Sequence, residues 1–336
     1  MPFKQVIGHR RVVALLVRSI DRGSLPPSLI FAGPAGVGKR LTAIATAQLL
    51  NCTDRVGEPP DIDACGVCAA CTRIARGVHS DVLVVEPGDS GSIRIDQVRE
   101  IVDRAAYRPF EGRRRVVIID RADALVPAAQ NALLKTLEEP PSASIFILVT
   151  AQPDVLLPTV RSRCPRLRFG SLRVDDLVAV LVERGRTPQE ARAIAATADG
   201  SVQRALESIA GDPVEGLEVA QQVLARAAAS DDPRRRIEGA KDLLAKTGAG
   251  GAGDREQLAS HLRSMASLLR DAELLSTRAD VRALAHPDLT PVLERLAQTY
   301  RGERGERAFT AVDRALAALD RNAGVKIVAD WLMLQL

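Results

Sequence analysis

Residues 33–40, GPAGVGKR, have the spacing of a phosphate-binding loop in every position but the last. In such a loop the glycines let backbone N–H groups surround the phosphates, and the lysine, here Lys39, reaches the outer phosphates. The glycines of the stretch are Gly33, Gly36 and Gly38. A Ser or Thr hydroxyl normally follows the lysine and ligates Mg²⁺, but this chain has Arg40, whose guanidinium has no acceptor atom. The stretch therefore predicts phosphate binding with defective metal chemistry.

A nucleotide hydrolase also needs acidic side chains at the end of a later strand, which hold Mg²⁺ and orient the attacking water. The matching segment is VVIIDRAD (116–123), in which Asp120 ends the apolar run. The next position, usually the Glu that polarises water, is Arg121. Two cations, Arg40 and Arg121, thus stand where a metal ligand and a base are expected. We expect the chain to have lost ATP hydrolysis of its own.

Four cysteines with the spacing C-x12-C-x2-C-x2-C form a second candidate site: Cys52, Cys65, Cys68 and Cys71. Four thiolates at this spacing can close a tetrahedral structural Zn²⁺ site. An iron–sulfur cluster uses the same ligands, and free thiols are a third possibility. The crowded spacing disfavours disulfides. His79 lies nearby, but four cysteines already complete the shell.

The elements that position these residues alternate in type through the first half of the chain. Buried strands are predicted at 29–33, 82–86, 115–120, 144–150 and 166–169, with helices around 38–50, 94–106 and 127–138. Continuously apolar strands that alternate with helices predict an α/β fold with a parallel, five-stranded sheet covered on both faces. A strand before the phosphate loop and a helix after it disfavour the alternative of a chance Gly-rich turn.

Beyond Phe169 the patterns are helical. Two short helices are expected within 173–200, and helical periodicity alone continues from about 208 to the end, with a Gly-rich loop at 246–254. Charged residues make up 26% of the chain and the net charge is +4, too mild to indicate nucleic acid by itself. The first ten residues contain no apolar signal region, so we expect an intracellular, cytoplasmic location.

Together, NALLKTLEEPP (131–141), RSRC (161–164) and the opening IGHRRVVALLVRSIDRGSLPPSLIFAGPAGVGK resemble the bacterial DNA polymerase III clamp loader family, of the AAA+ class. The resemblance covers residues 3 to about 207. The remaining C-terminal part resembles the family only in its helical character and in its ending, NAGVKIVADWLMLQL. An amphipathic helix explains most of NALLKTLEEPP, and its polar residues, Lys135, Glu138 and Glu139, offer a relay between the nucleotide site and a DNA-facing surface.

Within that family the gamma/tau motor subunits hydrolyse ATP, whereas the delta-prime subunit is a stator whose own site is often degenerate. Arg40 and Arg121 resemble the delta-prime pattern. Where the motor subunits have a sensor arginine, this chain has Gln203, and Arg204 is rotated by about 100° around a helix, so we expect it to point elsewhere. Thr150 matches the position of the family's other nucleotide sensor.

The resemblance gives Arg163, in RSRC, the role of an arginine finger supplied in trans to ATP in an adjacent motor subunit. A planar guanidinium suits phosphate oxygens and stabilises charge that develops during phosphoryl transfer. RSRCPRLRF contains four arginines, so composition alone favours a solvated basic surface. Ser162 and Cys164 would position the loop.

The resemblance further implies zinc at the cysteines and a heteropentamer with gamma/tau and delta subunits that loads the sliding clamp onto primer-template DNA. The chain would be part of the polymerase holoenzyme without being an ATPase itself, and ATP binding in its own site is doubtful. We expect three domains: an AAA+ domain at 1–169 with a zinc module at about 51–72, a helical lid at 170–207, and a helical collar at 208–336.

Two other functions remain open. A gamma/tau-type motor would tolerate Arg40, but it predicts an acidic residue at 121 and an arginine at 203, where this chain has Arg121 and Gln203. Another AAA+ remodeller of DNA replication or repair is a more remote alternative, disfavoured by the cysteines combined with LLKTLEEPP.

Overall fold

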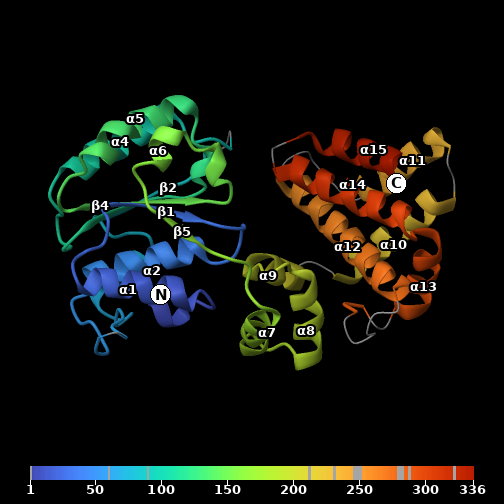
Figure 1. The fold of residues 1–336 in the computed structure, drawn as a ribbon, viewed down its shortest axis with the longest axis horizontal. Helices are drawn as coiled ribbons and strands as arrows, with labels where there is room; N and C mark the ends of the chain where they lie inside the picture. Colours follow the sequence, from blue (N-terminus) through green and yellow to red (C-terminus); the bar gives the residue numbers. More distant parts are fainter. Residues whose placement is uncertain are drawn as a thin grey trace. The chain divides into compact units, whose positions relative to one another are not determined.

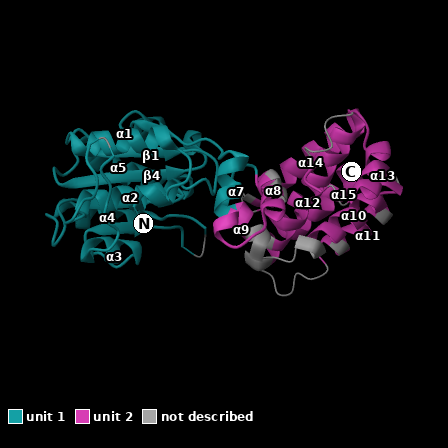
Figure 2. Ribbon diagram, turned by 90° about the horizontal axis from the view of Figure 1, so that it is seen from below, with its two compact units in different colours: residues 1–180, 199–203 teal, residues 181–198, 204–336 magenta. Residues whose placement is uncertain are grey.

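The computed structural model describes residues 2–59, 61–88, 91–210, 213–229, 232–244, 252–277, 284–286, 289–320 and 323–336. The chain divides into two compact units. The first comprises Met1–Val180 and Asp199–Gln203, and the second comprises Leu181–Ala198 and Arg204–Leu336 (Figure 2). Each unit is described by itself below.

The first unit is built on a parallel five-stranded sheet. Its strands are β1 (Ser28–Ala32), β2 (Val82–Val85), β3 (Arg115–Ile119), β4 (Ser144–Thr150) and β5 (Arg166–Arg168). The strand order is β2-β3-β4-β1-β5, and every pairing is parallel. This sheet confirms the predicted α/β class. The carboxyl ends of β1, β3 and β4 lie side by side because these strands are neighbours, which brings the loops after Ala32, Ile119 and Thr150 together.

Helices cover both faces of the sheet (Figure 1). On one face lie α1 (Arg10–Asp21), α2 (Lys39–Asn51) and α3 (Ala69–Ala75); on the other lie α4 (Ile95–Ala106), α5 (Pro127–Glu138) and α6 (Pro158–Arg161). Alternate strand residues supply the two cores, because successive side chains of a strand point to opposite faces. Leu29 and Phe31 pack with the first set of helices, and Ile30 packs with the second. Short 3₁₀ helices occur at Phe3–Gln5, Ala122–Ala124 and Pro153–Val155.

Three helices follow the sheet: α7 (Val174–Glu183), α8 (Pro188–Thr197) and α9 (Val202–Ala210). Helix α8 begins as its sequence predicts. The Thr187 hydroxyl accepts a hydrogen bond from Glu190 N, and the Glu190 carboxylate accepts one from Thr187 N. This reciprocal capping box satisfies two donors that a helix start leaves unpaired.

The described residues of the second unit form helices and the turns that connect them, with no strand among them. Its main helices are α10 (Pro213–Ala229), α11 (Pro233–Leu244), α12 (Ala252–Ser276), α13 (Thr290–Thr299), α14 (Glu303–Asp320) and α15 (Val325–Gln335). Helix α12 contacts each of the others, and one apolar core joins them. Tyr300 is buried in that core, where its hydroxyl donates to Leu224 O at 2.9 Å. Most of the Gly-rich loop expected at 246–254 lies outside the described residues, and α12 begins at Ala252.

The expected domain boundaries at 169 and 207 stay a prediction. No helix of the described residues is long and apolar enough to cross a membrane.

Candidate functional site

The phosphate-binding pattern forms a loop between β1 and α2, as its strand–loop–helix context predicts. Gly36 and Gly38 have φ angles of 72° and 101°, a left-handed region that favours glycine. Gly38 is the N-cap of α2, so the first N–H groups of the helix open onto the loop. The backbone therefore has the form of a phosphate cradle.

Lys39 is folded back onto this loop. Its side chain is almost fully buried, and Nζ donates to Gly33 O at 2.6 Å and to Pro34 O. Burial lowers the pKa of Lys39 to about 8, against the opposing influence of Asp123 and Asp120. The ammonium group therefore satisfies loop carbonyls at the position from which it would reach a phosphate.

Arg40 binds the carboxylates of the site. Its Nη1 lies 3.2 Å from Asp120 Oδ2 and also forms an ion pair with Glu86. Asp120 comes directly after β3 and is 15% exposed, and its other oxygen accepts a hydrogen bond from Arg121 N. Arg121 adopts a left-handed φ of 51°, unusual for a residue with a side chain. The two arginines noted in the sequence thus both adjoin Asp120, one through its guanidinium and the other through its backbone.

Thr150, at the end of β4, has its hydroxyl occupied by neighbouring groups. Its Oγ1 donates to Asp123 Oδ1 at 2.7 Å and accepts from Gln152 N at 3.0 Å. Sequence reasoning missed Asp123, although it is only three residues beyond Asp120 in the segment already singled out. Because Asp123 also accepts Ala151 N, it holds the turn after β4 against the turn after β3.

Three further residues contact the phosphate loop within the first unit. Gln203 N donates to Gly36 O at 3.3 Å, and a Cβ added to Gly36 would lie 2.1 Å from Ser201 Oγ. His9 Nε2 is 2.8 Å from Val37 O. The family resemblance marks position 203 as one where Gln203 replaces a sensor arginine, and here the backbone of Gln203 binds the loop directly. Arg204 falls in the second unit, and its direction stays a prediction.

Arg163 lies on the short loop after α6, between two buried side chains, Val160 and Cys164. Its guanidinium is about one third exposed and pairs with Glu138, the last residue of α5. Its Nη1 donates to Thr159 O at 2.9 Å and to Ser162 Oγ at 3.3 Å. Burial raises the pKa of the Cys164 thiol to about 12, which keeps it a neutral packing group.

The four predicted cysteines come together between α2 and α3. Their sulfur atoms all lie within 4.8 Å of one another, with 3.6 Å between Cys52 and Cys65 and 4.0 Å between Cys52 and Cys68. A tetrahedral ion with Zn–S bonds of about 2.3 Å needs sulfur atoms roughly 3.8 Å apart. All four are free thiols, and backbone N–H groups of Cys65, Cys68 and Cys71 donate to sulfur atoms of the cluster. The donor set fits a single metal ion with no open position.

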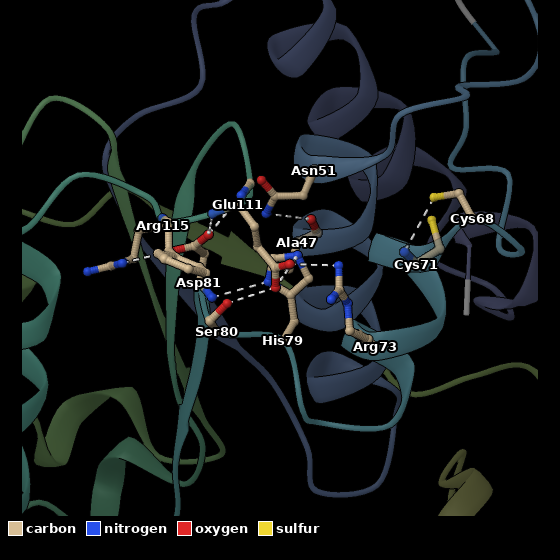
Figure 3. Close-up of polar contacts among 12 residues, drawn as sticks. Ala47, Asn51, Cys68, Cys71, Arg73, His79, Ser80, Asp81, Glu111 and Arg115 are labelled. Carbon is tan, nitrogen blue, oxygen red and sulfur yellow. Dashed lines mark hydrogen bonds and ion pairs between the residues drawn. The ribbon is translucent and has the colours of Figure 1, made fainter.

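His79 is separate from this cluster and belongs to a polar network beside it (Figure 3). Arg73, from α3, pairs with Glu111 at 2.6 Å, and the Ser80 hydroxyl donates to the same carboxylate at 2.7 Å. His79 Nε2 lies 3.7 Å from Glu111 Oε1. Burial lowers the pKa of His79 and favours the neutral ring, although Glu111 and Asp81 act against this.

Asp81 anchors the loop that carries Glu111. Its carboxylate accepts hydrogen bonds from the backbone N–H groups of residues 110, 111 and 112 and pairs with the Arg115 guanidinium at 2.7 Å. Burial alone would raise the pKa of Asp81, but these donors lower it to about 2. Sequence reasoning gave no sign of this network, because its members come from four separate segments.

Comparison with known proteins gives the family. Residues 8–173 match the family described as DNA polymerase III, delta subunit. The DNA polymerase III subunit gamma/tau of Mycobacterium tuberculosis is 35% identical over 226 residues, which cover 67% of this chain and 38% of that protein. The subunit delta' of Pseudomonas aeruginosa is 44% identical over 133 residues, or 39% of each chain. The subunit delta' of Bacillus subtilis is 35% identical over 185 residues, 55% of this chain and 54% of that protein.

Among solved structures, a gamma subunit-related protein of Thermotoga maritima aligns over 96% of this chain and 97% of its own, at 18% identity and a TM-score of 0.45. Together the sequence matches, the phosphate loop and the parallel sheet place this chain in the clamp-loader family of AAA+ proteins. The chain spans 38% of the length of its gamma/tau relatives.

Proposed function

We propose that this chain is a delta-prime-type stator of the DNA polymerase III clamp loader. It joins gamma/tau and delta subunits in a heteropentamer that loads the sliding clamp onto primer-template DNA in the cytoplasm. It lends Arg163 to the ATP site of a neighbouring motor subunit and does not hydrolyse ATP itself. Residues 1–169 serve as the AAA+ domain, 170–207 as its lid and 208–336 as the collar that holds the subunits together.

The observation that carries the loss of hydrolysis is the contact of Arg40 with Asp120 and Glu86. A divalent cation at Asp120 would have to displace a positive group that the carboxylate already binds. It would also lack the hydroxyl ligand that Ser or Thr supplies in a working loop. The residues present therefore do not fit Mg²⁺, and the phosphate cradle remains without the metal chemistry that phosphoryl transfer requires.

The role of Arg163 in trans is supported by where its side chain lies. Buried neighbours fix the backbone on both sides, while the guanidinium is partly exposed and held by three polar contacts. An arginine that is oriented before its partner arrives loses less conformational entropy when it engages phosphate oxygens. Arg163 lies beyond β4, in a segment separate from the Arg40 loop, which suits service to a different subunit.

The cysteine cluster is proposed to hold one structural zinc ion through Cys52, Cys65, Cys68 and Cys71. Bound there, zinc would cross-link the end of α2 to the start of α3, a segment with few apolar side chains of its own. It would have no part in phosphoryl transfer, since the four thiolates leave no open position.

Steady-state ATPase measurements test the proposal. The isolated chain with ATP and Mg²⁺ should show no turnover above background, and a reconstituted complex with clamp and primed DNA should lose turnover at the adjoining site when Arg163 is changed to Ala. Arg168→Ala, in the same arginine-rich stretch, is the matched control and should leave the rate unchanged. Robust hydrolysis by the isolated chain would refute the stator role.

The second candidate is a gamma/tau-type motor. It is favoured by the 35% identity to gamma/tau relatives over 67% of this chain. This alternative predicts that the isolated chain binds ATP with Mg²⁺ and hydrolyses it, so the same measurement separates the two functions.

A further inference from the structure

The backbone of Arg163 and its side chain are held in place by different interactions. Its backbone is fixed because Val160 and Cys164, three residues before and one after, are buried in the core beneath α5 and α6. Its side chain, by contrast, extends to a surface where it is 33% exposed. The direction of the guanidinium therefore depends on polar contacts rather than on packing.

Those contacts come from two sources. Thr159 O and Ser162 Oγ, which both accept from Nη1, belong to the same short loop as Arg163. The only partner from another element among the described residues is Glu138, which binds Nη2. Of the five N–H donors of a guanidinium, three are engaged in these bonds, which leaves the Nε–H and one Nη2–H for a ligand at the exposed edge.

The neighbouring Arg161 shows that this arrangement is particular to Arg163. Arg161 also forms an ion pair, with Asp154 at 2.7 Å, but that partner is seven residues away in the adjoining turn and is 82% exposed. Glu138 is 25 residues from Arg163 and ends the helix α5. Of these two pairs, only Arg163–Glu138 links its arginine to a long helix that covers the sheet.

We infer that Glu138 is a positioning residue for Arg163: its carboxylate holds the guanidinium in the direction from which it engages phosphate oxygens of the adjacent subunit. This inference rests on the proposed function of Arg163 in trans. Without the carboxylate, the long side chain would spread over several rotamers, and part of the population would point away from the neighbour's site. Glu138 itself does not touch the nucleotide.

The expected effect is modest and falls on one kinetic parameter. Glu138→Ala should lower kcat at the adjoining site roughly 1.4- to 5-fold, which corresponds to the range of about 0.2–1 kcal/mol for pairs as exposed as this one. The KM for ATP should not change, because Arg163 acts on the transferred phosphoryl group rather than on ground-state binding. Glu138→Gln keeps an oxygen that accepts the Nη2 hydrogen bond and should lose less than Glu138→Ala.

The test is a double-mutant cycle in the reconstituted clamp loader with clamp and primed DNA. The variants are Glu138→Ala, Glu138→Gln, Arg163→Ala and the double Ala variant, with Asp154→Ala, which removes the partner of Arg161, as the matched control. If Glu138 acts through Arg163, Glu138→Ala has no further effect once Arg163 is Ala, and Asp154→Ala leaves kcat unchanged. Elution of each complex as an intact assembly and an unchanged unfolding temperature exclude a general structural effect.

The outcomes separate the two proposals. If Arg163→Ala itself keeps wild-type turnover, the function in trans is wrong and the inference about Glu138 falls with it. If Arg163→Ala lowers kcat but Glu138→Ala leaves kcat unchanged or raises it, only the positioning role is overturned. The same holds if kcat of the double Ala variant falls by the product of the two single losses.

Discussion

The Arg40 guanidinium and the Asp120 carboxylate form an ion pair, with 3.2 Å between Nη1 and Oδ2, at the mouth of the phosphate loop. These two positions supply a hydroxyl and a carboxylate to the metal of a working site, and in this chain they bind each other. Glu86 adds a second carboxylate to the same guanidinium. The loop therefore has the backbone of a phosphate cradle, and the positive charge beside Asp120 and Glu86 comes from the Arg40 guanidinium rather than from a metal ion.

Arg40→Thr should give the loop a divalent-cation dependence that the wild type lacks. The change frees Asp120 and Glu86 and restores a hydroxyl ligand, so ATP should bind at least about tenfold more tightly with Mg²⁺ than with EDTA, a difference of about 1.4 kcal/mol. Calorimetric titration measures this. Arg40→Ala, which frees the carboxylates without adding a hydroxyl, is the control. Equal Mg²⁺ dependence in wild type and Arg40→Thr would contradict the prediction.

Purified protein should contain about one zinc ion per chain, because four sulfur atoms lie within 4.8 Å of one another and match a closed tetrahedral site. Cys68→Ser should release the metal and lower the unfolding temperature by several degrees, as loss of a structural zinc removes its binding free energy from the folded state. Elemental analysis and thermal unfolding provide the readouts. Cys164→Ser, outside the cluster, should retain full zinc. Iron with visible absorption bands would point instead to an iron–sulfur cluster.

Asp81 should make the first unit acid-sensitive. Its pKa in the folded chain is about 2, below the ordinary 3.8. The ionised Asp81 carboxylate therefore contributes its full stabilisation of the folded chain above about pH 4, and this contribution is lost as the pH falls toward 2. Asp81→Asn should lower the free energy of unfolding by about 2 kcal/mol at neutral pH and flatten this acid dependence. Denaturant titrations at pH 3, 5 and 7 measure both effects, with Asp103→Asn on an exposed face of α4 as the control. If the free energy of unfolding of Asp81→Asn still falls with decreasing pH as it does in the wild type, groups other than Asp81 cause that fall.

Gly36→Ala should destabilise the chain more than Gly23→Ala. Both residues have positive φ, 72° and 64°, so each substitution costs about 1 kcal/mol in backbone strain. Only at Gly36 would the added Cβ also meet other atoms, 2.1 Å from Ser201 Oγ and 2.7 Å from Gln203 Cβ, whereas nothing lies within 4 Å at Gly23. Thermal unfolding compares the two variants. Equal losses would mean that 201 and 203 do not rest on the loop in solution.

The sequence predicted the elements of the first unit well. The expected strand at 144–150 matches β4, and the expected helix at 127–138 matches α5. These segments were readable because buried parallel strands are continuously apolar, and prolines mark the start and the stop of that helix. Helix α1, in which seven of the twelve residues are apolar, is not among the elements that the sequence patterns predicted.

Contacts between distant segments were beyond sequence reasoning. Nothing in RSRC indicates that Arg163 meets Glu138, and nothing near GPAGVGKR indicates that Glu86 joins Asp120 around Arg40. Charge alone offers each arginine many carboxylates, and the choice follows from which strand and helix ends are neighbours in space. The proximity of Ser201 to Gly36 could not be predicted either, because the two residues are far apart in the sequence.

The two apolar cores on opposite faces of the sheet have an evolutionary consequence. Cys52 and Cys71 belong to one core, whereas Val160 and Cys164, which flank Arg163, belong to the other. Because the sheet separates these two cores, selection can act on the cysteine cluster and on the loop of Arg163 independently. Loss of the four cysteines in a homologue is therefore not expected to entail loss of the arginine, and loss of the arginine is not expected to entail loss of the cysteines.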